Sequence, residues 1–550
     1  MLESTKFLNL NLLFIIPARG GSKGIPRKNL RNLGGKPLLY YSISTAQKVN
    51  HNKSIYVSSE DEEILNLASK YQAKIQKRDP MLSKDETTLD EVIFNAYQAI
   101  CKNENSVFDF IITLQPTSPL LSTKSLEAAI QRMIDNPSID TMISAVEDTH
   151  LSWSKVDGEF IPNYIERVNR QYLKPTYKET GGFLITRPSI ISARGRIGNT
   201  IDLFTLDATE AIDIDTFEDW SICEFYLKRK KILFLVSGYR EIGLGHIYNT
   251  LVIANEILAH EILFFCDAKS QMGFEKIKQF NYPVFIQKGD NLQKEVLQHA
   301  PDVIISDRLD TKKEDIQHFL QAEIPLIHFE DLGEGSKYAD LVFNAIYPEE
   351  KKLKNHFFGA EYFCARDEFI LSEQKEIHKN VKSILLVFGG VDPNNLTQKV
   401  LDAIGLYCLE NSISIKVVTG FGYQQSDSLK KFKNITVHQN VKDISTYMLK
   451  ADVVFTSAGR TTYELALLGV PSIVLAQNDR EMTHFFASEK FGFLNLGIGV
   501  QVEASTILNG LKKMMNYEFR VKMQKKMTQK DLKSGKKKVV SIIKNFIDQL

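Results

Sequence analysis

The sequence predicts an α/β protein built from largely parallel sheets, and three observations support that class. Short apolar runs of strand length, such as 10–16 and 108–114, alternate along the chain with stretches of helical periodicity. Such alternation is typical of parallel strands joined by crossover helices. Glycine-rich loops follow several strands, which is where such sheets bind ligands. At 550 residues the chain exceeds one hydrophobic core, so we expect domains over 1–228, 229–375 and 376–550.

The elements of the first domain follow from this alternation. Strands are expected over 10–16, 54–58, 108–114 and 142–145. Helices are expected from Lys36 onward and over 61–71, 89–101 and 124–136. The first apolar run could imitate a signal peptide, but Glu3 lies in its leader and no small-residue cleavage site follows, so a buried strand is preferred.

The first strand runs into a loop with three glycines and four basic residues, Arg19-Gly20-Gly21-Ser22-Lys23-Gly24-Ile25-Pro26-Arg27-Lys28. Glycine lets a backbone approach a polyphosphate with its N–H groups, and the cations neutralise the phosphate charge. A basic surface turn is the alternative, but so many cations would repel one another without an anion between them. The spacing fits neither a P-loop nor a dinucleotide-binding loop.

Three further segments of this domain carry polar side chains after predicted strands. Leu114-Gln115-Pro116-Thr117-Ser118-Pro119 is a stiff loop in which Gln115 and Ser118 can bind a sugar. The segment 78–85 is a polar loop that opens a helix. Asp213 and Asp215 lie two residues apart, and in an extended chain they would point the same way and share one hard cation, Mg²⁺. Alone, such a pair usually marks a solvated strand end.

In order and spacing, these motifs resemble the CMP-sialic acid synthetase family of cytidylyltransferases over residues 10–228. The resemblance implies a Rossmann-like nucleotidyltransferase domain that uses CTP, Mg²⁺ and a nonulosonic acid. It implies the following roles: Arg19, Lys23, Lys28 and Asn29 at the triphosphate, with Ala18, Gly20 and Ser22 in the same loop; Arg78 and the backbone near Thr87 at the cytidine; Gln115 and Ser118 at the sugar; Asp213 and Asp215 at the metal.

The resemblance also implies a homodimer, formed by a hairpin over 152–177 that leans over the neighbour's site. This hairpin contains Arg167, Arg170, Gln171 and Tyr177 as candidate substrate contacts, and it is expected to supply a cation for the sugar carboxylate. Leu121, Thr180 and Leu184 depart from the family pattern near the sugar. The choice among sialic, legionaminic and pseudaminic acids therefore stays open.

Composition excludes some classes of function. Acids and bases nearly cancel to a net charge of +1, which argues against general nucleic-acid or membrane-surface binding. Five cysteines without a C-x-x-C pair indicate reduced thiols in a cytoplasmic protein. No apolar run reaches the length needed to span a bilayer.

The second half opens with a basic hinge, 227–231, and a strand over 232–236, followed by the loop Ile242-Gly243-Leu244-Gly245-His246 and a helix. A histidine at a helix N-terminus feels the positive end of the dipole, which favours a neutral imidazole that can act as a base. A lone histidine there is more often structural. Its place directly after the glycines, at the mouth of a sheet, favours a functional role.

A second nucleotide-binding half is expected from Ser383. It contains Gly389-Gly390 after one strand and Ser457-Ala458-Gly459-Arg460-Thr461-Thr462-Tyr463-Glu464 after another. Free amides at the helix start suit a diphosphate, and Glu464 can accept from ribose hydroxyls.

Two such halves resemble the GT-B architecture, and within it the UDP-sugar hydrolases of pseudaminic acid synthesis, which bind a UDP-sugar. The resemblance covers 230–545 and implies that His246, with Gly245 beside it, activates a water that displaces UDP. It also implies nucleotide contacts at Gly389, Gly390, Ser457, Gly459, Thr461, Thr462 and Glu464. Leu235, Ser237, 247–249 and 478–481 depart from that family's pattern, so a glycosyltransferase or a non-catalytic nucleotide-sugar-binding scaffold remain alternatives.

Overall fold

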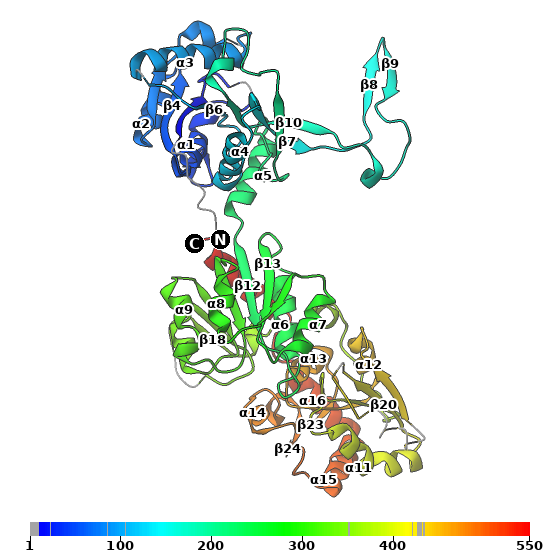
Figure 1. Ribbon diagram of the computed structural model, residues 1–550. Coiled ribbons are helices and arrows are strands. Elements are labelled where there is room, and N and C mark those ends of the chain that lie inside the picture. The colour runs from blue at the N-terminus through cyan, green and yellow to red at the C-terminus, as the bar shows by residue number, and fades with distance from the viewer. Residues whose placement is uncertain are drawn as a thin grey trace, which may run out of the picture. The chain divides into compact units, whose positions relative to one another are not determined.

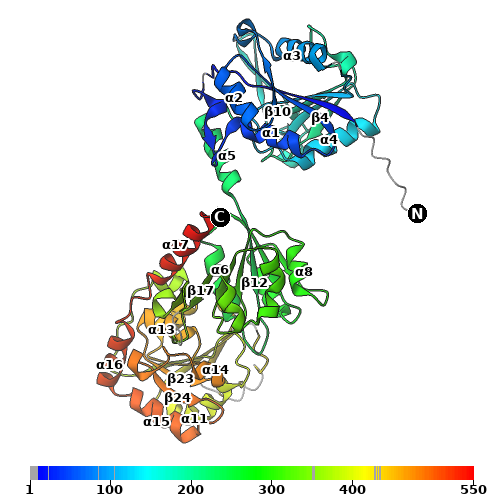
Figure 2. The ribbon, with the colours of Figure 1, turned by 90° about the vertical axis from the view of Figure 1, so that its left-hand side faces the viewer.

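The computed structural model describes residues 10–22, 24–84, 86–104, 106–349, 353–420, 422–425, 429, 432 and 435–550. The chain forms two compact units, Met1–Lys228 and Arg229–Leu550, shown in Figures 1 and 2 and described separately. Both units are α/β with largely parallel sheets, so the predicted class is confirmed. Within the described ranges, no helix is both long and apolar enough to cross a bilayer.

The first unit is built on a seven-stranded sheet in the order β11-β7-β10-β6-β1-β4-β5. All neighbouring strands are parallel except β10, which runs antiparallel to both β6 and β7. The strands are β1 (Asn11–Pro17), β4 (Asn52–Ser59), β5 (Lys74–Lys77), β6 (Phe110–Leu114), β7 (Thr141–Glu147), β10 (Tyr177–Thr186) and β11 (Ile201–Thr205). Because β1 is central, the loop that leaves it opens at the middle of the sheet edge.

Helices cover both faces of this sheet, and the alternation of side chains along β1 explains why. Leu12, Phe14 and Ile16 face α1, α2 and α4, whereas Leu13 and Ile15 face α3. The helices are α1 (Leu38–Lys48), α2 (Glu62–Lys70), α3 (Leu89–Glu104), α4 (Thr123–Asp135) and α5 (Phe217–Lys228). The helix expected from Lys36 begins at Leu38, because 36–37 form the short strand β3 (Lys36–Pro37), which pairs with β2 (Asn32–Leu33).

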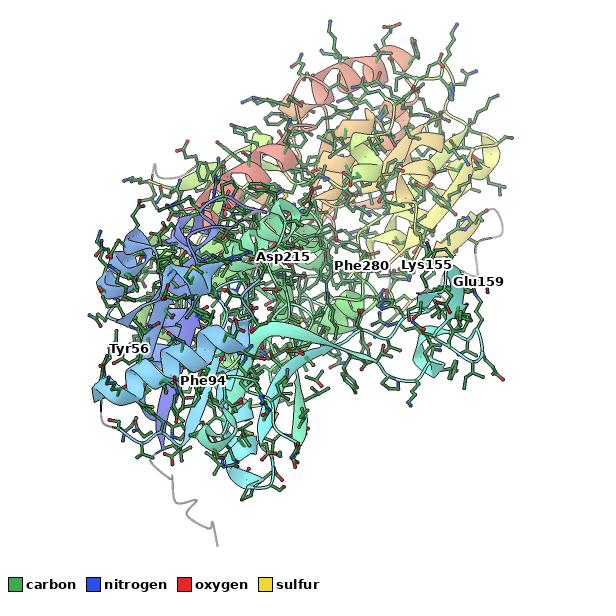
Figure 3. The ribbon with its side chains drawn as sticks, turned by 90° about the horizontal axis from the view of Figure 1, so that it is seen from above. Tyr56, Phe94, Lys155, Glu159, Asp215 and Phe280 are labelled. Atoms are coloured by element: carbon green, nitrogen blue, oxygen red, sulfur yellow. The ribbon has the colours of Figure 1, made fainter. Side chains whose placement is uncertain are left out.

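The predicted hairpin is present as β8 (Trp153–Val156) paired antiparallel with β9 (Glu159–Pro162). Figure 1 shows it projecting from the body of its own unit, and Figure 3 marks it by Lys155 and Glu159, away from Tyr56 and Phe94. Its large apolar side chains, including Trp153 and Phe160, are exposed.

The second unit contains two parallel sheets, in the orders β14-β13-β12-β15-β16-β17-β18 and β21-β20-β19-β22-β23-β24. The first comprises β12 (Lys231–Val236), β13 (Glu261–Cys266), β14 (Val284–Ile286), β15 (Val303–Asp307), β16 (Leu326–Phe329), β17 (Leu341–Asn344) and β18 (His356–Phe358). The second comprises β19 (Ser383–Val387), β20 (Ser414–Thr419), β21 (Ile435–Gln439), β22 (Val453–Thr456), β23 (Ser472–Ala476) and β24 (Leu494–Ile498).

Helices pack on both faces of each of these sheets. They are α6 (Gly245–Ala254), α7 (Gln271–Lys278), α8 (Leu292–Leu297), α9 (Gln317–Gln321), α10 (Asp367–Ile370), α11 (Leu396–Glu410), α12 (Ile444–Lys450), α13 (Thr461–Leu468), α14 (Asp479–Met482), α15 (Ala504–Met514), α16 (Tyr517–Met527) and α17 (Gly535–Ile547). The helix α17 packs its buried residues Val539, Val540, Ile543 and Ile547 into the core of the first sheet. The helix α17, which lies in the predicted range 376–550, therefore packs with the earlier half of this unit.

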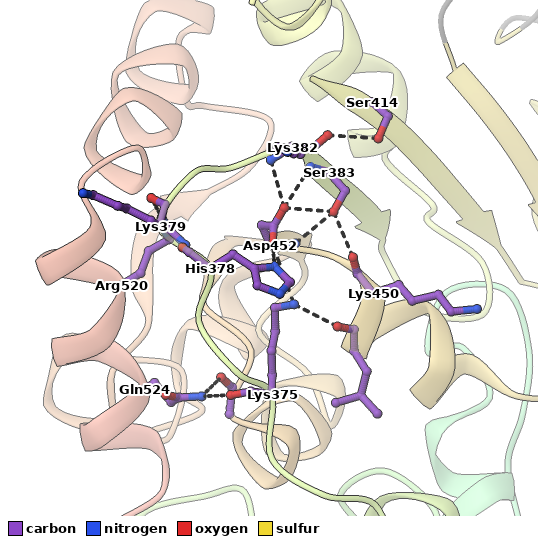
Figure 4. A network of polar contacts seen from close by, with 12 residues as sticks. Lys375, His378, Lys379, Lys382, Ser383, Ser414, Lys450, Asp452, Arg520 and Gln524 are labelled. Atoms are coloured by element: carbon purple, nitrogen blue, oxygen red, sulfur yellow. Dashed lines mark hydrogen bonds and ion pairs between the residues drawn. The ribbon is translucent and has the colours of Figure 1, made fainter. Parts of the chain in front are cut away.

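A buried polar network anchors the connection between the two halves, as Figure 4 shows. Asp452 accepts from the backbone N–H groups of Lys382 and Ser383, and its other oxygen lies 2.9 Å from Nδ1 of His378. Arg520, which is fully buried, donates to the carbonyls of His378 and Lys379. These contacts fix the path by which the chain enters β19.

Candidate functional sites

The glycine-rich loop after β1 contacts the acidic segment 213–215. Nζ of Lys28 donates to the carbonyl oxygen of Ile214, 186 residues away, at 2.5 Å, and lies 3.6 Å from a carboxylate oxygen of Asp215. A Cβ on Gly24 would come within 2.5 Å of the Asp215 carbonyl oxygen, so the missing side chain permits this contact. The structure thus brings together the two motifs that the sequence places far apart.

The proline-rich loop after β6 lies at the same place. The Ser118 hydroxyl is 3.5 Å from a carboxylate oxygen of Asp213, and a Cβ on Gly181 would come within 3.0 Å of that oxygen. The carbonyl oxygen of Gln115 accepts hydrogen bonds from the Ser42 hydroxyl and from the Ser118 N–H. Gln115, Ser118 and Asp213 therefore belong to one cluster.

Glu60, which was not predicted from the sequence, accepts a hydrogen bond from a backbone N–H group of the glycine-rich loop. Its carboxylate accepts from the Gly20 N–H at 2.7 Å and from the Ser83 hydroxyl at 2.7 Å. A Cβ on Gly20 would come within 2.5 Å of a carboxylate oxygen of Asp61. Gly20 is therefore required by close packing, while its N–H holds an anionic group as it would hold a phosphate. The available signal was the position of Glu60 directly after a strand.

Two residues predicted to contact nucleotide already have protein partners in the structure. Ala18 is buried and its N–H donates to the Ser58 carbonyl, so neither its side chain nor its N–H is open to a ligand. Arg78 is 5% exposed and donates to the carbonyl oxygen and hydroxyl of Ser58. Burial lowers the pKa of the Arg78 guanidinium, partly offset by Glu60, and the charge of Arg19 lowers it further. Arg78 thus holds the end of β4 behind the loop.

The remaining predictions differ in how far the structure supports them. The Asn29 side chain donates to the carbonyl of Arg19, and Ser22 is partly exposed on the same loop. The Thr87 N–H donates to the Lys84 carbonyl, and the predicted contact of the backbone near Thr87 with cytidine stays a prediction. Lys23 lies outside the described residues.

The hairpin residues do not join this cluster. Arg170, Gln171 and Tyr177 are exposed, and the projection of the hairpin in Figure 1 separates it from the body of its own unit.

Asp213 and Asp215 have the donor set that suits Mg²⁺. That ion usually keeps several waters and takes one or two carboxylates together with substrate phosphates. Among the described residues, no group of three or more His, Cys, Asp and Glu side chains is arranged to hold a metal. A pair of carboxylates beside this glycine-rich loop fits Mg²⁺ bound jointly with a substrate, rather than a closed structural site.

A pair of neighbouring glycines tests the contact between the loop and the acidic segment. Gly24→Ala would push a methyl group against the Asp215 carbonyl, and we expect it to destabilise the first unit by about 1–3 kcal/mol. Gly21→Ala is the matched control, because nothing lies within 4 Å of the added atom. Thermal unfolding of both variants checks this; equal melting temperatures would contradict the contact.

The second unit has a cavity of about 470 Å³ where its two halves meet. Most of the predicted residues line it: Gly245, His246, Gly389, Gly390, Ser457, Gly459, Thr461 and Glu464. Thr462 does not line it: its side chain is fully buried and its hydroxyl donates to the Gly459 carbonyl. Thr462 therefore shapes the loop from behind.

A buried carboxylate holds the cavity histidine. Nδ1 of His246 lies 2.6 Å from Oδ1 of Asp307, which ends β15 and is fully buried. The predicted orienting influence was the helix dipole alone, and sequence reasoning missed Asp307. With Nδ1 bound to Asp307, Nε2 is the ring atom left to act on a ligand.

Three more residues extend this contact across the cavity. Asn249 donates from Nδ2 to Oδ2 of Asp307 at 2.6 Å. Arg460 donates to Oδ1 of Asn249 at 2.6 Å and to Oε1 of Glu330 at 3.3 Å. We call His246, Asp307, Asn249, Arg460 and Glu330 the bridging network, because Arg460 belongs to the later half and the other four to the earlier half.

Glu464, expected at a ribose, is already paired. Its Oε1 accepts two hydrogen bonds from Arg366, at 3.1 and 2.8 Å. The Arg366 guanidinium also lies over the ring of Tyr248, and all three residues line the cavity. A ligand hydroxyl at Glu464 would therefore meet a carboxylate of fixed orientation.

Burial raises the pKa of Glu330 from 4.5 to about 7, against the opposing charge of Arg460. The proton is thus favoured in the folded state, and this contribution to stability is present below pH 4.5 and lost as the pH rises through 7. We expect Glu330→Gln to gain about 2–3 kcal/mol of stability relative to the native chain between pH 5 and pH 8. Chemical denaturation at both pH values measures it; Glu518→Gln, at an exposed site, is the control. A gain that does not depend on pH would contradict it.

Comparison with known proteins identifies a domain in each unit. Residues 13–157 match the family described as cytidylyltransferase, and residues 384–540 match the glycosyltransferase family 28 C-terminal domain. The pseudaminic acid cytidylyltransferase of Campylobacter jejuni is 43% identical over 127 residues, which are 23% of this chain and 54% of that protein. The resemblance of the first unit to cytidylyltransferases is confirmed.

One relative shares both domains. A Helicobacter pylori protein, named pseudaminic acid cytidylyltransferase and UDP-2,4-diacetamido-2,4,6-trideoxy-beta-L-altropyranose hydrolase, is 23% identical over 526 residues, covering 90% of this chain and 93% of that protein. The chain spans about half the length of the curated relatives with which it shares 30% identity or more. Among solved structures, MurG of Acinetobacter baumannii aligns with 57% of this chain and 99% of its own at 15% identity and a TM-score of 0.42.

Proposed function

We propose that this chain, which joins a cytidylyltransferase domain to a glycosyltransferase family 28 C-terminal domain, catalyses two sugar-nucleotide reactions. The first unit transfers CMP from CTP to a nonulosonic acid and releases pyrophosphate. The second unit hydrolyses a UDP-sugar to UDP and the free sugar. The names of the relatives from Campylobacter jejuni and Helicobacter pylori support both assignments.

One observation supports the first reaction above the others: the contact of Lys28 with the segment 213–215. It places cations and carboxylates beside the loop that would hold the triphosphate. In the reaction, the anomeric hydroxyl of the acid attacks the α-phosphorus of CTP, and Arg19 and Lys28 offset charge on the departing pyrophosphate. Gln115 and Ser118 orient the sugar from the neighbouring loop.

Mg²⁺ completes this proposal. Asp213 and Asp215 would hold it. When bound, it would neutralise charge that develops on the phosphates.

The acid substrate is proposed to be pseudaminic acid, because both named relatives act on it. Incubation with CTP, Mg²⁺ and pseudaminic, legionaminic or sialic acid, with products read by mass spectrometry, tests the class and the choice together. Formation of a CMP conjugate of another of these acids would identify that acid, rather than pseudaminic acid, as the substrate. Conversion of none would refute the first assignment.

The second reaction rests on the His246–Asp307 pair in the cavity between the halves. His246 would take a proton from water at Nε2 as that water attacks the anomeric carbon, and Asp307 would stabilise the imidazolium. Backbone N–H groups at the start of α13, near the lining residues Gly459 and Thr461, would bind the diphosphate. Release of UDP from the UDP-sugar named for the Helicobacter pylori relative tests it.

Two other functions of the second unit are separated by the same assay. A rate that depends on an added sugar acceptor would indicate a glycosyltransferase, which the family 28 match also allows. Binding of UDP without any turnover would indicate a scaffold. The hydrolase is preferred because a histidine held by a buried carboxylate is suited to activating water.

We also propose a homodimer and a cytoplasmic location. The exposed apolar side chains of the hairpin, Trp153, Phe160 and Ile165 among them, would be covered by a second copy of the first unit. The five free cysteines favour a reducing compartment.

A further inference from the structure

The bridging network joins the nucleotide loop to the proposed base. Arg460 lies between Gly459 and Thr461, which both line the cavity, and it caps the start of α13. Its side chain crosses to the earlier half, where it donates to Asn249 and Glu330. The loop that would hold the diphosphate therefore also touches the machinery of the other half.

The links from Arg460 through Asn249 and Asp307 to His246 are each 2.6 Å long and buried or partly buried. Asn249 is 2% exposed and uses both ends of its amide, accepting from Arg460 at Oδ1 and donating to Asp307 at Nδ2. Asp307 in turn uses both carboxylate oxygens, one for Asn249 and one for His246. Because each carboxylate oxygen has its own partner, the orientation of Asp307 depends on Asn249 as much as on His246.

Packing holds Arg460 in this position. Its guanidinium lies 4.7 Å from the centre of the Phe363 ring, and a Cβ on Gly245 would come 3.6 Å from its Cδ. Gly245 immediately precedes His246. Arg460 thus lies along the backbone of the histidine loop as well as at the far end of the hydrogen bonds.

From these contacts we infer that Arg460 is a positioning residue that orients the His246–Asp307 pair through Asn249. The base is then aligned only when the later half lies against the earlier one, so the loop that binds nucleotide also prepares the residue that activates water. This inference deepens the proposed hydrolase activity and rests on it for its catalytic meaning. The hydrogen-bonded arrangement itself can be tested without turnover.

A second arginine supplies the control. Arg480 also joins the halves, with a two-pronged ion pair to Asp310 at 2.8 and 2.9 Å and a hydrogen bond to the Tyr347 hydroxyl. It lies in α14, and none of these partners belongs to the bridging network. Arg480→Gln therefore removes another charged contact between the halves while leaving Asn249 and Asp307 untouched.

The first measurement is the proton NMR signal of the hydrogen-bonded Nδ1–H of His246, assigned by its loss in His246→Ala. A short bond to a carboxylate shifts this proton to low field. We expect Arg460→Gln and Asn249→Asp to weaken or abolish the signal, whereas Arg480→Gln retains it. Asn249→Asp keeps the acceptor for Arg460 but loses the donor to Asp307. Should Arg460→Gln not fold, Arg460→Lys is the second variant, because one ammonium group replaces the guanidinium that donates to both Asn249 and Glu330.

The second measurement is the rate of UDP release from UDP-2,4-diacetamido-2,4,6-trideoxy-β-L-altropyranose. Arg460→Gln and Asn249→Asp should each lower kcat about 10- to 100-fold while KM changes by less than about threefold. The double variant of Arg460→Gln and Asn249→Asp should lose no more kcat than the worse single variant, because both changes break the same chain of hydrogen bonds. In the double variant of Arg460→Gln and Arg480→Gln, the separate fold-losses in rate should multiply.

The outcomes separate two failures. An unchanged His246 signal in folded Arg460→Gln and Asn249→Asp overturns the inference, whatever the native rate. A native protein that releases no UDP, but whose signal responds as expected, refutes the hydrolase and leaves the positioning role standing.

Discussion

Replacing His246 with alanine is expected to slow UDP release by about 10²- to 10⁴-fold and to leave CMP transfer unchanged. The change removes the group proposed to take the proton from water, and general-base catalysis is commonly worth that factor. Because His246 belongs to the second unit, the first unit keeps its own site. Parallel assays of UDP release and of CMP-sugar formation on the same preparation measure both effects.

The matched control for this variant is His378→Ala. His378 also contacts a buried carboxylate, Asp452 at 2.9 Å, but it lies in the connection between the halves and does not line the cavity. Titration with UDP should give His246→Ala an affinity within about threefold of the native one, since the diphosphate is proposed to bind near α13. UDP release that survives in His246→Ala would remove the basis for the hydrolase.

Replacing Asp215 with alanine is expected to lower CMP transfer by about 10²- to 10³-fold without unfolding the first unit. Asp215 is largely exposed and its side chain contacts only the Lys28 ammonium among the ion pairs of the described residues, so little packing is lost. Asp213→Ala should be as damaging, because both carboxylates are proposed to hold one Mg²⁺. Rates measured against Mg²⁺ concentration should show that both variants bind Mg²⁺ more weakly than the native protein does. A chelator should stop the native reaction.

Glu218→Ala controls for a lost negative charge nearby. Glu218 is exposed in the first turn of α5, three residues after Asp215. Full activity in Asp215→Ala, together with turnover that a chelator does not affect, would disprove the metal site. Loss of activity in all three variants would point instead to a general effect of charge.

The sequence was sufficient to predict those features whose signal lies within a short stretch of residues. Strands and helices of the first unit were predicted within a few residues, because each buries one regular face against the sheet. The glycine-rich loop and the pair Asp213 and Asp215 were identified by spacing, and the structure brings both to one place through Lys28.

The residues that were missed share a physical reason. Asp307, Asn249, Glu330 and Arg460 come from four separate elements, and each looks ordinary in its own stretch of sequence. Only the fold brings them together, across 211 residues in the case of Arg460 and Asn249. Thr462 was assigned to the ligand with the rest of the segment 457–464, but one step along a helix from Thr461 turns the side chain by about 100°, here into the core.

The return of α17 to the first sheet of the second unit has a consequence for synthesis. Residues 535–547 fill part of the core around 232–236, so that sheet keeps an uncovered apolar face until they leave the ribosome. A premature stop codon beyond residue 500 would spare every residue of the cavity and still yield a chain that aggregates or is degraded. Nonsense mutations between residue 500 and α17 should therefore be as harmful as early ones.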